Sequence, residues 1–167
     1  MAWIFPDPAD RRLRLPRLFG ILFDSDAAGM RLLTAGGEAA TLWRRPGRVH
    51  TSRLEMLRRA IPLVWAMGPN RARAMRVGNA MAAHTPSGAF WYLHFAGCDP
   101  ADQGKGLGAA AVRGGLERAA GRLPVYLETA TERNLGFYQG LGFAVTSEWR
   151  VPGGGPCFWS MLRAPAG

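Results

Sequence analysis

The chain has 167 residues, of which 48% are hydrophobic, and its formal net charge is +9. This length and apolar content predict one domain over residues 1–167 with a hydrophobic core, and no apolar run is long enough to span a membrane. We find no secretory signal pattern. The two cysteines, Cys98 and Cys157, are far apart in sequence and are typical of reduced thiols, so we expect a cytoplasmic protein without a disulfide.

The positive charge comes almost entirely from arginine, because Lys105 is the only lysine. A basic protein attracts anions such as nucleotides or nucleic acids, but a solvated basic surface explains the charge equally well. The arginines are scattered along the chain and form no dense tail. We therefore expect neither a nucleic-acid partner nor a membrane partner.

The first third of the chain predicts a helix followed by a hairpin. Asp7-Pro8 is typical of a helix cap with proline at the first helical position, and Pro16 is expected to kink or divide the helix that follows. Residues Met30–Ala35 and Glu38–Arg44 flank Gly36-Gly37, which favours a two-residue hairpin turn.

The middle of the chain predicts two helices and one strand. Ser52 and Glu55 have the spacing of a capping box ahead of an apolar helical pattern, and a second helix is expected over residues 70–83. Phe90–Cys98 is aromatic-rich and too short for a comfortable helix, so it predicts a strand.

The rest of the chain alternates helices and strands. We expect a small-residue helix after Gly106, a strand over Val125–Glu128, a helix around Asn134–Tyr138, and strands over Phe143–Val151 and Cys157–Arg163. Thr129 and Glu132 again have capping-box spacing. Strands and helices interleaved in this way predict a mixed α/β sheet.

The segment from Cys98 to Gly108, with glycines at 104, 106 and 108, joins the central strand to a helix. A glycine-rich turn at a helix N-terminus presents unpaired N–H groups and a positive dipole end, so it predicts a phosphate-bearing ligand. A kinase-type phosphate loop is excluded, because no Gly-Lys-Ser or Gly-Lys-Thr follows.

A dinucleotide-binding fold is a fairer alternative. Gly104, Gly106 and Ala109 fit its glycine pattern, and Glu128 lies about twenty residues on, at a strand end. Against it, residues 99–103 lengthen a turn that should be tight, and few strand–helix units follow the motif.

Two blocks of the sequence together resemble the GNAT N-acetyltransferases, which use acetyl-coenzyme A. The first block is Gln103-Gly104-Lys105-Gly106-Leu107-Gly108, which matches the family loop Gln/Arg-x-x-Gly-x-Gly/Ala. The second is Tyr126–Thr129 followed by Asn134–Phe143. The resemblance runs from Trp91 to the C-terminus and is closest to puromycin N-acetyltransferase-like members.

The resemblance implies a mixed, mostly antiparallel sheet flanked by helices. The family fold starts with a strand and a helix ahead of the region that Trp3–Pro6 resembles, so we expect the chain to lack both and its hairpin to present an uncovered edge. A truncated chain, a misassigned start and completion by another subunit are alternatives that the sequence does not separate.

The resemblance also implies the cofactor contacts. Backbone groups of the strand before the loop would pair with pantetheine, the loop would hold the pyrophosphate with added charge from Lys105, and Asn134 would bond the pantetheine chain. Gly97 is expected to mark a bulge that opens the sheet. The implied cofactor-binding residues are Ala96, Gly97, Cys98, Gln103, Gly104, Lys105, Gly106, Leu107, Gly108, Asn134 and Tyr138.

Direct acetyl transfer to an amine requires a base for the amine and an acid for the departing thiolate. Tyr138 matches the family's acid, against the alternative of an aromatic packed under the strands. Glu128, at a strand end, is our first choice of base, with His94 as the second; each also has a purely structural interpretation. Direct transfer makes both cysteines packing residues, and the sequence shows no metal-ligand spacing, so we expect no metal.

These observations predict an acetyl-CoA-dependent N-acetyltransferase acting on a primary amine of a small molecule. A non-catalytic acyl-CoA-binding or interaction module and a dinucleotide-binding oxidoreductase fragment are the alternatives. The sequence does not identify the amine or the base, and it leaves a homodimer open.

Overall fold

The structure is a computed structural model that describes residues 1–26, 28–47, 61–119 and 121–165, so the predicted cap at Ser52 and Glu55 lies outside it. Residues 61–67 are also helical. In chain order, the other elements are α1 (Pro8–Ser25), β1 (Met30–Leu33), β2 (Ala39–Arg44), η1 (Gly68–Asn70), α3 (Arg71–His84), β3 (Trp91–Cys98), η2 (Pro100–Asp102), α4 (Leu107–Arg118), β4 (Val125–Thr129), η3 (Glu132–Asn134), α5 (Leu135–Gln139), β5 (Ala144–Arg150) and β6 (Cys157–Arg163).

Six strands form one sheet in the order β1-β2-β3-β4-β6-β5. Every neighbouring pair is antiparallel except β3 and β4, which run parallel. The prediction of a mixed, mostly antiparallel sheet is therefore confirmed. In the described residues α1 is the first regular element, and the hairpin strand β1 lies at the edge of the sheet. A dinucleotide-binding fold needs a doubly wound parallel sheet, which this arrangement is not.

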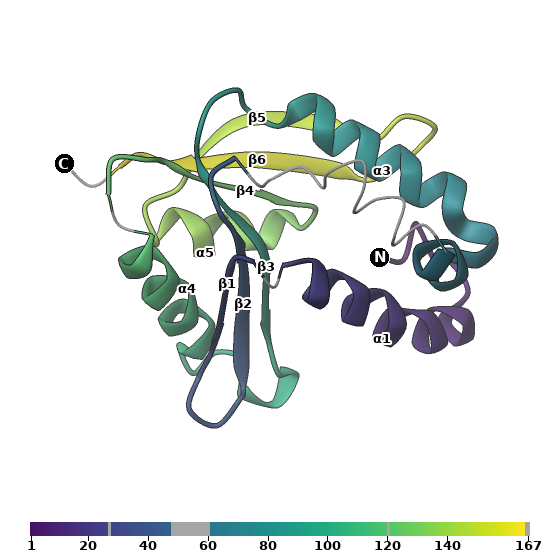
Figure 1. Cartoon of the computed structure of the whole chain (residues 1–167), viewed down its shortest axis with the longest axis horizontal. Coiled ribbons are helices and arrows are strands. Elements are labelled where there is room, and N and C mark those ends of the chain that lie inside the picture. The colour runs from purple at the N-terminus through teal and green to yellow at the C-terminus, as the bar shows by residue number, and fades with distance from the viewer. Residues whose placement is uncertain (27, 48–60, 120, 166–167) are drawn as a thin grey trace.

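Helices cover both faces of the sheet (Figure 1). One core cluster packs α4 and α5 against one face; it includes Trp43, Leu93, Val112, Leu116, Leu127, Tyr138 and Met161. On the other face, Ala80 of α3 packs with Trp149 of β5, and Phe19 of α1 meets Phe95 of β3 with ring centroids 5.4 Å apart. Because side chains alternate along a strand, β3 and β4 contribute to both layers, with Leu93 and Leu127 in the first cluster and Tyr92 and Tyr126 on the other face.

Helix α1 begins where the sequence predicts. The Asp7 side chain accepts a hydrogen bond of 2.7 Å from the N–H of Asp10, which satisfies one free donor of the first turn. The helix is not divided at Pro16, which lies inside a single element that ends at Ser25. Leu18 is buried, whereas Leu13 is 60% exposed, so the leucines of α1 do not all reach the core.

The hairpin between β1 and β2 is confirmed, but its turn is longer than expected. The N–H of Gly37 donates to the carbonyl of Thr34 at 2.9 Å, and Thr34 in turn donates to Ala39. Gly37 has a φ of 80°, which favours glycine.

Within the described residues, no helix combines the length and apolar character needed to cross a membrane.

Candidate active site

The central feature of the site is a split between β3 and β4. These strands pair at only two positions, Trp91 with Val125 and Tyr92 with Tyr126. Beyond Tyr92, β3 continues beside β2, whereas β4 continues beside β6. The backbone of β3 therefore leaves one edge without a strand partner among the described residues, and Ala96 and Gly97 are exposed although their strand lies inside the sheet.

A β-bulge lies at the start of this split. Leu42 of β2 faces Phe95, and its neighbour Trp43 faces Leu93, so His94 is the extra residue. The bulge sends His94 and Phe95 to the same face of the sheet, because His94 contacts Asp26 at the end of α1 and Phe95 contacts α1. The prediction of a bulge at Gly97 is wrong, since Gly97 pairs in register with Ala40.

A cleft of about 580 Å³ lies beside the split and is lined in part by residues of α4 and α5. Strand β3 lines it with Ala96, Gly97 and Cys98. The loop, α4, η3 and α5 complete the predicted part of its wall with Gln103, Gly104, Gly106, Leu107, Gly108, Asn134 and Tyr138. The structure thus brings together ten of the eleven residues expected to bind the cofactor.

The eleventh, Lys105, does not line the cleft. Its ammonium lies 2.6 Å from Oδ1 of Asp102, and its side chain is 60% exposed. An exposed pair of this kind contributes little to stability. Lys105 therefore pairs with the carboxylate of Asp102 in its own loop. The geometry gives no support to the expectation that Lys105 adds charge to the site.

The glycine loop is shaped for close approach by a ligand. Gly104 and Gly106 have φ values of 83° and 80°, and a Cβ placed on either residue would meet no atom within 4 Å. Gly106 is the N-cap of α4 and provides no side-chain hydrogen bond to the first helical turn. The first N–H groups of α4 therefore keep no side-chain cap, which suits an anion at the positive end of the helix.

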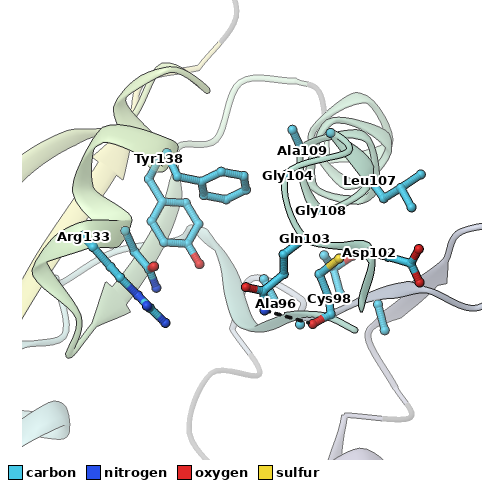
Figure 2. A pocket seen from close by; sticks show the side chains of 16 residues that line it. Ala96, Cys98, Asp102, Gln103, Gly104, Leu107, Gly108, Ala109, Arg133 and Tyr138 are labelled. Atoms are coloured by element: carbon cyan, nitrogen blue, oxygen red, sulfur yellow. Dashed lines mark hydrogen bonds between the residues drawn. The ribbon is translucent and has the colours of Figure 1, made fainter. Parts of the chain in front are cut away.

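Asp99 anchors the start of the loop through its carboxylate and its backbone N–H. Its carboxylate accepts a hydrogen bond of 2.9 Å from the N–H of Ala101, and the N–H of Asp99 donates to the carbonyl of Glu38 at 2.7 Å. Gln103 donates weakly to the carbonyl of Cys98 at 3.5 Å, the bond drawn in Figure 2. These contacts link the loop to β3 and to the hairpin, so its position depends on the sheet.

Tyr138 lies on the wall opposite this loop, with its ring directed into the cleft (Figure 2). Phe137 and Phe143 pack edge-on against the ring with centroids 5.0 and 5.9 Å away, which fixes its orientation. No described residue makes a hydrogen bond to its hydroxyl. Burial raises the pKa of Tyr138, so the phenol stays protonated at neutral pH and can donate a proton.

Asn134 and Arg133 lie at the same wall of the cleft. The Asn134 amide reaches Thr129 Oγ1 at 3.4 Å. Thr129 also accepts from the N–H of Thr131 at 3.3 Å, so it shapes the turn into α5 and does not form the predicted capping box with Glu132. Arg133 was not among the predicted site residues, although an arginine next to Asn134 of the second block is a signal for an anionic ligand.

The cleft also includes residues from β2 that the sequence did not indicate. Ala40 and Thr41 line it, and Thr41 Oγ1 accepts a hydrogen bond of 2.9 Å from the indole of Trp43. These residues reach the site only through the register of β2 against β3, which no local motif specifies. Asp102, Ala109 and Phe137 complete the unpredicted lining.

The two candidate bases lie outside this cleft, on the face of the sheet covered by α1 and α3. Both oxygens of Glu128 accept phenolic hydrogen bonds, from Tyr92 at 2.6 Å and from Tyr126 at 2.9 Å. Tyr126 also meets Ser160 Oγ at 2.9 Å. Burial raises the pKa of Glu128, and the phenols oppose that rise only in part. No described cation forms an ion pair with Glu128.

His94 is the second candidate, and its Nδ1 lies 2.6 Å from Oδ2 of Asp26. Tyr92 lies between the two candidates, since its hydroxyl contacts Glu128 and its ring centroid is 5.3 Å from that of His94. Both candidates therefore flank the opening of the β3–β4 split, on the side away from the glycine loop.

Neither cysteine has the surroundings of a nucleophile. Cys98 lines the cleft with its Cβ close to Gly108. Cys157 lies on β6, where its thiol meets Glu148 at 3.4 Å. Both are free thiols. Among the residues that the structure describes, no group of three or more His, Cys, Asp or Glu side chains is arranged to hold a metal ion.

The fold matches solved acetyltransferase structures. A structure of histone acetyltransferase HPA2 and related acetyltransferase from Corynebacterium glutamicum is 25% identical, with a TM-score of 0.68 over 97% of this chain and 80% of that one. Polyamine N-acetyltransferase of Drosophila melanogaster, an enzyme that forms N-acetylagmatine, is 15% identical, with a TM-score of 0.54 over 95% and 82% of the two chains.

A third structure, Naa20 of Chaetomium thermophilum in complex with a bisubstrate analogue, is 11% identical, with a TM-score of 0.53 over 87% and 72% of the two chains. No protein-family model matches the sequence. The chain has the GNAT acyltransferase fold that these acetyltransferases share, and the last two likenesses show the fold alone.

Proposed function

We propose that this protein is an N-acetyltransferase that moves the acetyl group of acetyl-CoA directly to a primary amine of a small molecule. The observation that carries this proposal is the split between β3 and β4. It leaves an open strand edge next to a glycine-lined helix N-terminus, with a buried, protonated tyrosine across the cleft. These three features match three parts of acetyl-CoA. The strand edge suits its amide-bearing arm, the helix N-terminus suits its phosphates, and the tyrosine suits its leaving thiolate.

The residues present fit acetyl-CoA. The loop from Gln103 to Gly108 would hold the pyrophosphate through backbone N–H groups, because Cβ atoms that would fill the cradle are missing at Gly104 and Gly106. The free edge of β3 at Ala96–Cys98 would pair with the amides of pantetheine, and the Asn134 side chain would bond the same arm from the other side. Arg133 adds a positive charge at the cleft.

When bound, acetyl-CoA supplies an acetyl carbon on a thioester sulfur: the amine nitrogen bonds to that carbon as the carbon–sulfur bond breaks. Tyr138 is the proposed acid that gives its proton to the departing sulfur. Its raised pKa keeps that proton in place before the transfer. The amine must lose a proton to a base, for which Glu128 and His94 are the candidates on the far side of the split.

The acceptor is proposed to be a small amine. The region from Trp91 to the C-terminus resembles puromycin N-acetyltransferase-like members, and the Drosophila neighbour is a polyamine N-acetyltransferase that forms N-acetylagmatine. The proposal includes a cytoplasmic location, which the two free thiols support.

The proposal is tested by calorimetric titration of the purified protein with acetyl-CoA and, separately, with NADH. We expect acetyl-CoA to bind and NADH not to bind. Binding of NADH alone would contradict the proposal. Binding of acetyl-CoA with no transfer to any amine of a broad panel would identify an acyl-CoA-binding module instead of an enzyme.

A further inference from the structure

Asp26 is a buried carboxylate that no motif in the sequence indicates. It follows the last residue of α1, and 1% of its surface is exposed. Its Oδ1 accepts from Nε of Arg44 at 2.7 Å, and its Oδ2 lies 2.6 Å from Nδ1 of His94. A carboxylate buried this deeply is stable as an anion only when it is paired in this way.

The charge state of Asp26 follows from these two contacts. Burial alone raises the pKa of Asp26, but the hydrogen bonds of His94 and Arg44, the charge of the guanidinium and, at acidic pH, the charge of the protonated His94 ring outweigh burial and hold the pKa below its usual value. Asp26 is therefore an anion at neutral pH. An anionic carboxylate can only accept hydrogen bonds, so Nδ1 of His94 must carry the hydrogen that joins them.

This contact determines which nitrogen of His94 is basic. Burial lowers the pKa of His94, and the hydrogen bond and charge of Asp26 only partly offset that effect. The ring is therefore neutral at pH 7, and with hydrogen on Nδ1 its lone pair is on Nε2. No described residue makes a hydrogen bond to Nε2. The side chain keeps 11% of its surface exposed, so the nitrogen is not sealed in the core.

The position of His94 is as informative as its tautomer. It is the bulged residue of β3, two positions after the last pair between β3 and β4, where the sheet opens. The charged and titratable groups that face it are Asp26 from the end of α1, Arg44 from β2, Tyr92 from its own strand, and Glu128 of β4 through Tyr92. Glu128 already receives a phenolic hydrogen bond at each oxygen.

We propose that Asp26 is a positioning residue for the acetyl-transfer reaction: it holds His94 with hydrogen on Nδ1, so that Nε2 takes the proton of the acceptor amine. This inference rests on the proposed function. As the carbon–nitrogen bond forms and the carbon–sulfur bond breaks, one proton passes from the amine to Nε2 and another from Tyr138 to the sulfur. Asp26 stays ionised throughout, and Arg44 keeps it so. Glu128 holds the tyrosine pair in place.

The first test needs no activity. The protonation and tautomer of His94 are read from ¹⁵N chemical shifts of the histidine ring during a pH titration, in the wild type and in Asp26→Asn. Because Asp26 raises the pKa of His94, its loss should move the titration of that ring to lower pH and mix the tautomers. Asp10→Asn is the matched control, because Asp10 also pairs with an arginine on α1 but lies far from His94 along the helix. An unchanged His94 titration in Asp26→Asn would overturn the proposal.

The second test is the pH profile of kcat/KM with a primary amine. We expect Asp26→Asn to lose about tenfold or more at neutral pH and to move the acid limb to lower pH, while His94→Gln loses at least 100-fold and loses that limb. A uniform loss without a shifted limb would make Asp26 merely structural. An acid limb that survives in His94→Gln but disappears in Glu128→Gln would assign the base to Glu128.

A folding failure of Asp26→Asn and a failure of the proposed function can each be distinguished from a failure of this inference. If Asp26→Asn does not fold by circular dichroism, Asp26→Glu preserves the charge and should keep the acid limb near its wild-type position, which a shape-only role would not require. If the wild type transfers acetyl to no amine, the proposed function fails together with the base role of His94. The ring titration then still decides whether Asp26 orients His94.

Discussion

The two faces of the sheet at the β3–β4 split present different chemical groups. The face covered by α4 and α5 presents glycine backbone, a helix N-terminus and one phenol to the cleft. The opposite face presents a buried network of titratable side chains that runs from Asp26 through His94 and Tyr92 to Glu128. On the proposed function, the first face would bind acetyl-CoA and the second would take up the proton of the amine.

The largest effect should come from filling the glycine cradle. Gly106→Trp places a large side chain at the start of α4, at a φ of 80° that favours glycine. We expect acetyl-CoA affinity to fall by at least about 100-fold in calorimetry, because the backbone can no longer approach the phosphates. Arg113→Trp, on the exposed side of the same helix, is the control and should bind normally. Equal acetyl-CoA binding by both variants would contradict the placement of the cofactor on this face.

Tyr138→Phe tests whether the cleft face also contributes chemistry. The change removes only the hydroxyl, which has no hydrogen-bond partner among the described residues. We expect kcat to fall by about 100-fold while acetyl-CoA binding is unchanged, because a general acid acts on the transfer step. Because burial raises the pKa of Tyr138, the wild type should keep its activity until the pH exceeds about 10. Unchanged kcat in Tyr138→Phe would leave the ring as a packing residue.

Gly115→Ala tests how tightly the cleft face packs against the sheet. A Cβ at Gly115 would lie 2.1 Å from the Trp43 ring, so the helix or the indole must move. We expect a loss of about 1–3 kcal/mol in the free energy of unfolding, measured by denaturant titration. Gly114→Ala is the neighbouring control: its Cβ would lie 3.4 Å from the end of the Arg118 side chain, so improved helix propensity should offset any cost. Similar losses in both variants would contradict close packing at Trp43.

The smallest effect is the pH dependence of the opposite face. The pKa of Asp26 in the folded protein lies below its unfolded value of about 3.9, so its stabilisation is present above that pH and is lost as the pH falls through the folded pKa. Denaturant titrations of the wild type and Asp26→Asn should therefore differ most above about pH 5 and converge as the pH falls below about 4. A difference that stays constant down to the acid unfolding of the protein would mean that the charge of Asp26 contributes no stability.

The two faces also differ in how far the sequence predicts them. The residues from Gln103 to Gly108 are adjacent in the chain, and their glycines carry a local signal that survives without knowledge of the fold. The strand before them, the helix after them and Tyr138 were all predicted, and the cleft brings them together. Such a motif can be recognised in the sequence because adjacent residues set its backbone geometry and present the N–H groups that bind the ligand.

The opposite face depends on contacts between distant parts of the chain. Asp26 and His94 are 68 positions apart, and Asp26 and Arg44 are 18 apart. Their meeting depends on the bulge at His94, which sends two successive side chains to one face and which no residue pattern indicates. The sequence therefore suggested Glu128 and His94 as separate candidate bases but did not reveal the buried carboxylate that distinguishes them.

The most direct test of acetyl transfer is to incubate the wild-type protein with acetyl-CoA and a panel of small primary amines, and to measure released thiol and acetylated amine together. The account predicts equal amounts of both products with at least one amine, and a rate that falls about 100-fold in Tyr138→Phe. Thiol release without acetylated amine, or no product from a folded protein that binds acetyl-CoA, would contradict it.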